Sequence, residues 1–103
     1  MERKIFEYLK ELETRNNERI KYQVWDGQPL PDFAKYKFSA DFGPKYIRIW
    51  HANQHADKLI NKACFCFVDY SGNLYKAAGW KAPAKGIRGT LEKPLYFSAS
   101  FYR

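Results

Sequence analysis

The segment "GWKAPAKGIRG", residues 79–89, combines residue types that bind phosphate with one that stacks on a base. Lys81, Lys85 and Arg88 supply positive charge, and Trp80 supplies a flat aromatic face. Glycines let a backbone approach a phosphate closely, and Pro83 is well tolerated in the first turn of a helix. We therefore expect a short helical turn over 83–88 that carries Lys85 and Arg88 on one side and cradles an anion. The alternative is a surface loop that Trp80 anchors in the core while its lysines are solvated.

A second cluster, "KYIRIWHANQH", reads as a strand in which Tyr46, Arg48 and Trp50 share one face. Proteins that bind single strands use such rows of rings and cations. The alternative is that Tyr46 and Trp50 pack against a helix. Because Arg48 lies between them, we favour exposure of this face. Lys76, shortly before Trp80, completes the candidate nucleic-acid or phosphate-binding set.

Other chemistry has weaker support. His51 and His55 are four residues apart, but the first lies in a predicted strand, and Cys64 and Cys66 lack the usual zinc spacing. In a regular strand the two cysteines share a face, so we expect them to be unpaired, buried thiols in a reducing compartment. No local nucleophile or acid-pair motif is present, which favours a non-enzymatic protein without metal or cofactor.

The composition indicates one folded domain over residues 1–103 with an anionic partner. The chain is 46% hydrophobic and 18% aromatic and carries a formal net charge of +7. Residues 1–18 hold four Lys/Arg and five Glu, a net of −1, which leaves a net of +8 on residues 19–103. Nucleic acid, a nucleotide or an acidic protein would suit such a body. The first residues lack the apolar core of a secretory signal and no stretch is long enough to span a bilayer, so we expect a cytoplasmic protein without membrane contact.

The periodicity predicts one helix followed by short strands. Apolar residues recur at helical spacing over 3–15, and "NN" at 16–17 is expected to end the helix. A loop or single helical turn is expected over 53–62, and "DYSGN" at 69–73 is typical of a turn between strands. Strands are expected at 19–26, 33–38, 46–52, 63–69, 74–78 and 94–103. The predicted fold is α+β: an N-terminal amphipathic helix packed on a mainly antiparallel sheet of about five strands.

The stretch "VDYSGNLYKAAGWKAPAKGIRGTL" resembles a shared segment of a set of small, uncharacterised phage proteins, and covers about a quarter of the chain. The segment reads as an F-V-D strand, a G-N turn, Y-K, then W-K-A-P-A-K and an R-G pair. The matching positions are Phe67, Val68, Asp69, Gly72, Tyr75, Lys76, Trp80, Lys81, Ala82, Pro83, Ala84, Lys85, Arg88 and Gly89. The resemblance implies a viral origin and a role for this segment, and it implies no activity.

Together these features favour a phage accessory protein of the host cytoplasm that binds nucleic acid, single-stranded in the first instance, through basic and aromatic residues. Two alternatives stay open. The protein could sequester a small anionic nucleotide that serves as a host defence signal, or it could dock on a host protein and inhibit it. A nucleotide site often lies at a subunit interface, so a homodimer is compatible with the sequence.

Overall fold

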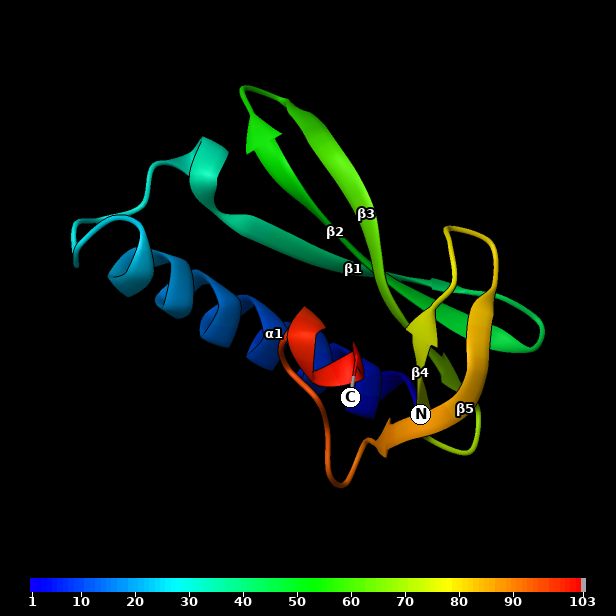
Figure 1. Cartoon of the computed structure of the whole chain (residues 1–103). Helices are drawn as coiled ribbons and strands as arrows, with labels where there is room; N and C mark the ends of the chain where they lie inside the picture. Colours follow the sequence, from blue (N-terminus) through cyan, green and yellow to red (C-terminus); the bar gives the residue numbers. More distant parts are fainter. Residues whose placement is uncertain (103) are drawn as a thin grey trace.

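The computed structural model describes residues 1–102, which form one long helix and a five-stranded sheet (Figure 1). The helix α1 spans Glu2–Gln23, and the strands are β1 (Tyr36–Phe42), β2 (Tyr46–His55), β3 (Lys58–Asp69), β4 (Asn73–Ala77) and β5 (Pro83–Thr90). A short 3-10 helix, η1 (Asp32–Ala34), precedes β1, and a second, η2 (Ser98–Tyr102), is the last described element. The strand order is β1-β2-β3-β4-β5 and every neighbouring pair is antiparallel. The predicted α+β fold is confirmed.

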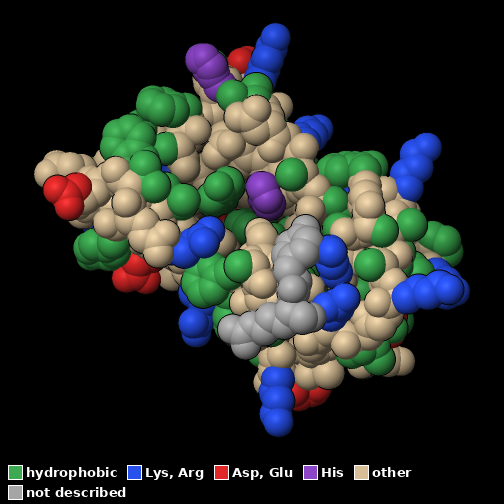
Figure 2. Space-filling model, in the orientation of Figure 1, with side chains coloured by type: hydrophobic (Ala, Val, Ile, Leu, Met, Phe, Trp, Pro, Cys, Tyr) green, Lys and Arg blue, Asp and Glu red, His purple; other side chains and the backbone are tan. Residues whose placement is uncertain are grey.

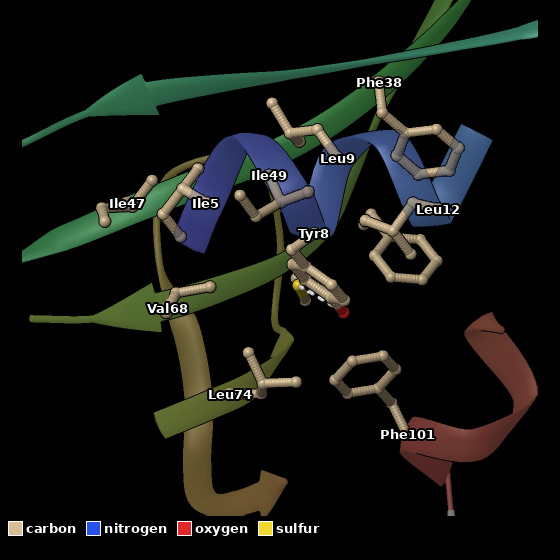
Figure 3. Close-up of a cluster of buried hydrophobic side chains, with 12 residues drawn as sticks. Ile5, Tyr8, Leu9, Leu12, Phe38, Ile47, Ile49, Val68, Leu74 and Phe101 are labelled. Atoms are coloured by element: carbon tan, nitrogen blue, oxygen red, sulfur yellow. Dashed lines mark hydrogen bonds between the residues drawn. The ribbon is translucent and has the colours of Figure 1, made fainter. Parts of the chain in front are cut away.

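The core lies between one face of the sheet and the apolar side of α1. Ile5, Tyr8, Leu9 and Leu12 are buried on the helix at the predicted spacing. Figure 3 shows these side chains directed at apolar residues of the sheet and at Phe101 from the C-terminal segment. The sheet residues labelled there are Phe38, Ile47, Ile49, Val68 and Leu74. We call this side of the sheet the inner face and the opposite side the outer face.

The helix is longer than predicted, and the prediction of a strand at 19–26 is wrong. Asn16 and Asn17 do not end the helix, because tertiary hydrogen bonds satisfy their side chains. The amide of Asn16 donates to the carbonyls of Leu12 and Tyr96, both at 2.8 Å. Tyr22 and Val24 are 62% and 68% exposed. The alternation over 19–26 therefore does not reflect a buried strand face. Although α1 is long, no helix within residues 1–102 is both long and apolar enough to cross a bilayer.

Side chains of α1 also cap the free edge of β1. A carboxylate oxygen of Glu13 accepts the Phe38 N–H at 2.8 Å. Asn17 accepts the Tyr36 N–H at 2.7 Å and donates to the Tyr36 carbonyl at 3.1 Å. An uncovered edge strand invites pairing with another chain, so these bonds both hold α1 against the sheet and protect the edge.

The loop predicted over 53–62 is instead the end of a tight β2–β3 hairpin (Figure 1). His55 pairs with Lys58, and Ala56 takes the positive φ of 56° that the turn requires. The residues are mostly polar and exposed, so they give no alternating pattern. Backbone pairing with the rest of the hairpin, rather than burial, extends the strands here.

A bulge in β3 separates the two cysteines. Ile49 pairs with Cys66 while the next residue, Trp50, pairs with Cys64, so Phe65 is the extra residue. Cys66 is consequently on the inner face with Ile49, and Cys64 is on the outer face with Trp50. The expectation that the cysteines share a face is wrong, because it assumed a regular strand. Both are free thiols, as expected; Cys66 is buried and Cys64 is half-buried.

Two further predictions near the C-terminus are wrong. Residues 83–88 belong to β5 rather than to a helical turn, and Pro83 begins this edge strand, where proline is tolerated. The strand expected at 94–103 does not form within the described residues. The last described element is instead η2, whose Phe101 is 1% exposed in the core. The Leu95 carbonyl accepts a hydrogen bond from the Tyr8 hydroxyl, so α1 rather than the sheet binds this segment.

Candidate nucleic-acid interface on the outer face

The alternation of β2 places the predicted row of Tyr46, Arg48 and Trp50 on the outer face. Ile47 and Ile49, between them, are fully buried beneath α1. The alternative in which Tyr46 and Trp50 face the helix does not hold. The three outer residues are half-buried, and they lie over a β-sheet whose other face is sealed by the core.

Arg48 connects this row to the segment that carries Trp80. Its guanidinium carbon lies 4.7 Å from the centre of the Trp80 ring. Its Nε donates to the Trp80 carbonyl at 2.7 Å, and Nη1 donates to a carboxylate oxygen of Asp41 at 3.0 Å. One side chain therefore holds both the ring and the backbone of Trp80 against the sheet.

Trp80 also contacts Trp50. The two ring centres are 6.1 Å apart with the planes tilted by 52°, and the ammonium of Lys62 lies 5.3 Å from the Trp50 ring centre. Trp80 remains 40% exposed. Lys62, Trp50, Trp80 and Arg48 thus form a continuous series, which we call the indole series: two indoles in contact with each other, with one cation at each end.

Next to the indole series is a group of three rings on the neighbouring strands. Tyr46 contacts Phe67 and Tyr75, at ring-centre distances of 6.2 and 5.6 Å. Tyr75 in turn donates its hydroxyl to Asp69 at 2.8 Å, a bond that raises the pKa of Tyr75. Burial acts to raise the pKa of Asp69, but hydrogen bonds from Asn73, Tyr75 and Ser71 outweigh this effect. The pKa of Asp69 is therefore lowered. Asp69 is therefore an anionic anchor for the β3–β4 turn and for one edge of the aromatic surface.

Lys81 lies at the other end of the indole series, in a hollow of about 300 Å³ beside the β1–β2 turn. We call it the turn hollow. Its lining contains three cations, Lys45, Arg48 and Lys81, together with Asp41. Sequence reasoning did not select Lys45 or Lys62. Lys45 could have been found from its position next to Tyr46 in the sequence. Lys62 could not, because it reaches Trp50 only through the pairing of β2 with β3.

The other predicted cations lie elsewhere. Lys85 and Arg88 line a cavity of about 520 Å³ with Gly86, Ile87, Leu95 and Ser100, between β5 and the C-terminal segment. Lys76 pairs with Cys66, which puts it on the inner face by register. It lines a cavity of about 250 Å³ whose walls include Phe65 and Phe101 from the core and also Cys64 and Trp80. In the view of Figure 2, Lys and Arg side chains are spread over the surface without joining into one patch. The single cradle expected over 79–89 is therefore divided between two places.

The histidines and cysteines are dispersed. The His51 ring lies among those of Tyr36, Phe38 and Phe65, whereas His55 ends β2. Burial lowers the pKa of His51 and raises that of Cys64 to about 11. Within residues 1–102, no three His, Cys, Asp or Glu side chains are grouped closely enough to hold a metal ion.

Comparison with curated proteins and with solved structures finds no match to this chain. One protein-family model does match, over residues 1–96, which include α1, all five strands and every candidate site residue named above. The chain therefore belongs to the family of unknown function DUF7717.

Proposed function

We propose that the protein is a non-enzymatic phage accessory protein whose outer face binds single-stranded nucleic acid. The observation that carries the proposal is the indole series, in which the adjacent rings of Trp80 and Trp50 are flanked by Arg48 and Lys62. Rings of this kind stack with exposed bases, and the cations that flank them can meet the neighbouring phosphates.

The location of these residues supports a single strand over a duplex. Stacking needs bases with free faces, which a single strand offers and a duplex hides. The indoles lie over a sheet whose opposite face packs against α1. The binding surface is therefore ordered in the absence of a ligand. A preorganised aromatic surface loses little side-chain freedom on binding, which favours affinity.

The charge of the chain supports an anionic ligand. The formal net charge is +7, and four cations, Lys45, Arg48, Lys62 and Lys81, lie beside the outer aromatic rings. Binding that neutralises phosphates releases counterions, so affinity for a single strand falls by about 0.7 log unit per log unit of salt for each phosphate contacted.

The proposal is tested by titrating a labelled oligothymidylate of about twelve nucleotides, within the ~4–16 nucleotide span of comparable surfaces, at several salt concentrations. We expect fluorescence anisotropy to report binding that weakens steeply with salt. Trp80→Ala and Trp50→Ala should each weaken it by about 1–3 kcal/mol. Trp25, which contacts Phe33 beyond the end of α1, supplies the matched control Trp25→Ala. No detectable binding at low salt would exclude this function.

The cavity that Lys85 and Arg88 line favours a second candidate, capture of a small anionic nucleotide. Its volume of about 520 Å³ lies within the ~300–1,000 Å³ range of ligand sites. Calorimetric titration with mononucleotides and cyclic dinucleotides tests this candidate. This candidate would be supported over the outer face if binding heat is observed that Lys85→Ala and Arg88→Ala abolish. Trp50→Ala should leave that heat unchanged.

A further inference from the structure

The β1–β2 turn is held rigidly, and this fixes the position of Lys45. The Gly43 N–H donates to the Tyr46 carbonyl at 3.0 Å, and the Tyr70 hydroxyl donates to the Gly43 carbonyl. A Cβ on Gly43 would lie 2.8 Å from the Tyr46 carbonyl oxygen, so only glycine fits this turn. The Lys45 ammonium lies 5.5 Å from the ring centre of Tyr46, the residue that begins β2.

Lys81 reaches the same hollow from the loop between β4 and β5. The residue before it, Trp80, is fixed through its carbonyl by Arg48, so the loop enters the hollow at a defined point. Lys81 makes no ion pair with any residue in the range 1–102. Cations from a turn, a strand and a loop therefore converge on one small space.

Arg48 contributes a guanidinium that is only partly used. It has five N–H donors, and the bonds to Trp80 and Asp41 occupy Nε and Nη1. Nη2 has no hydrogen-bond partner among the described residues. The arginine side chain is 25% exposed, whereas that of Asp41 is 50% exposed, so an incoming anion meets the carboxylate and the guanidinium together.

We propose that the turn hollow holds one phosphate of the bound strand, and that Asp41 competes with this phosphate for Arg48. The inference rests on the proposed function and adds Lys45 as a binding residue and Asp41 as a residue that limits affinity. Three cations and one carboxylate give the hollow a net charge of +2, which suits one or two anionic charges. The aromatic side chains of Tyr46 and Phe67 also line it and give the site an apolar wall.

Lys45→Ala and Lys81→Ala test the phosphate site. Each should weaken binding of the oligothymidylate and reduce the salt slope, and the double variant should reduce the slope by at most about 0.7, which is the contribution of a single phosphate. Lys10, exposed on α1, provides Lys10→Ala as a control that removes the same charge far from the outer face. If both hollow variants keep the slope of this control while the tryptophan variants weaken binding, the strand does not use the hollow and only the proposed function survives.

Asp41→Asn tests the competition. It keeps the shape of the side chain and removes the repulsive charge, so we expect tighter binding, by about 2- to 5-fold, as the removal of one exposed charge interaction allows. Glu11, paired with Arg15 on α1, gives the matched control Glu11→Gln, which leaves affinity nearly unchanged. Weaker binding by Asp41→Asn than by this control would overturn the assignment of Asp41.

A phosphate could come from within a strand or from a free anion, and a second measurement distinguishes them. Inorganic phosphate is titrated into the protein at constant ionic strength while backbone amide NMR shifts are followed. If the oligonucleotide does not bind but phosphate shifts Gly43, Lys45 and Lys81, and Lys45→Ala abolishes these shifts, the hollow is a site for free phosphate. Absence of both responses overturns the hollow and the proposed function together.

Discussion

The guanidinium of Arg48 stacks on the ring of Trp80 and also donates a 2.7 Å hydrogen bond to the carbonyl of the same residue. A strand residue of β2 thereby fixes a loop residue 32 positions later in the chain. This double contact makes a loop tryptophan part of an ordered surface, and it explains why Trp80 is held in place although it is 40% exposed.

We expect Arg48→Lys to loosen Trp80 even though the charge is kept. A lysine ammonium cannot stack flat on the indole while bonding to both Trp80 and Asp41, because it lacks the planar fork. The near-ultraviolet circular dichroism from the coupled Trp50 and Trp80 rings should fall, and the free energy of unfolding should drop by about 1 kcal/mol. Arg15→Lys, in an exposed pair with Glu11, is the control and should change neither signal.

Trp80→Ala is expected to leave the protein folded. Its ring is 40% exposed, and Trp80 belongs neither to the buried core cluster nor to the partly buried side chains packed against it. Urea unfolding should show a loss of about 1 kcal/mol or less, as is usual for substitutions outside the core, while oligonucleotide binding weakens by the larger amount given above. Collapse of the fold, with no change in binding for Lys81→Ala, would show that Trp80 serves the architecture and that its neighbours are merely solvated.

Phe101→Ala should be far more costly than its terminal position suggests. The ring is 1% exposed and contacts Phe65 edge-on at 5.5 Å, so its removal leaves a cavity in the core. We expect the free energy of unfolding to fall by about 3–5 kcal/mol. Phe33, which is 58% exposed, provides the control Phe33→Ala, whose effect should stay near ~0.5 kcal/mol. Equal effects of the two substitutions would contradict the placement of η2 on the core.

His51 is expected to make stability depend on pH. Burial lowers its pKa in the folded state from the ordinary value of 6.5, and its Nδ1 is buried without a hydrogen-bond partner in the part of the chain that the structure describes. Well above pH 6.5 the ring is neutral in both states and contributes no pH dependence. As the pH falls below that value the unfolded chain binds a proton first, so stability is lost until the lower folded pKa is reached.

The comparison that isolates this contribution is urea unfolding of His51→Phe from about pH 8 to about pH 5, the range in which histidine titrates. Phenylalanine suits the ring cluster of Tyr36, Phe38 and Phe65 and cannot be protonated. The decrease in stability across the acidic part of this range should be smaller in His51→Phe than in the parent. His55→Gln, at the exposed end of β2, should keep the parent's profile.

The two thiols should differ in the cost of their removal and in reactivity. Burial raises the pKa of Cys66 even more strongly than the pKa of Cys64, which it raises to about 11. Cys66→Ala should cost about 1 kcal/mol or more, because the sulfur lies in the core beside Tyr8, and Cys64→Ala should cost less. Labelling with a thiol reagent at neutral pH should be slow at Cys64 and should occur at Cys66 only on unfolding. Rapid labelling of Cys66 in the native protein would contradict its burial.

The amino-acid sequence by itself determined the elements in which pattern and burial agree. The apolar stripe from Ile5 to Leu12 predicted α1, and the alternation of Ile47 and Ile49 with Arg48 predicted both the strand and its exposed face. The turn at 69–73 followed from Asp69, Gly72 and Asn73, and the structure adds the hydrogen bonds that Asp69 accepts from Ser71 and Asn73. These features depend on neighbours within a few residues, which is the range that a periodic pattern reports.

Only the tertiary structure decided the rest, because the deciding contacts join distant residues. Asn16 and Asn17 continue α1 since Tyr96 and Tyr36 satisfy their amides, 80 and 19 positions away. The alternating segment 94–102 follows α1 and the core instead of the sheet, because Phe101 and the carbonyl of Leu95 find partners there. The bulge at Phe65 turns Cys64 to the outer face. Pairing of β2 with β3 brings Lys62 to Trp50, and the contacts of Arg48 hold Trp80 of the β4–β5 loop beside them. Lys85 and Arg88 lie apart from these residues, on β5.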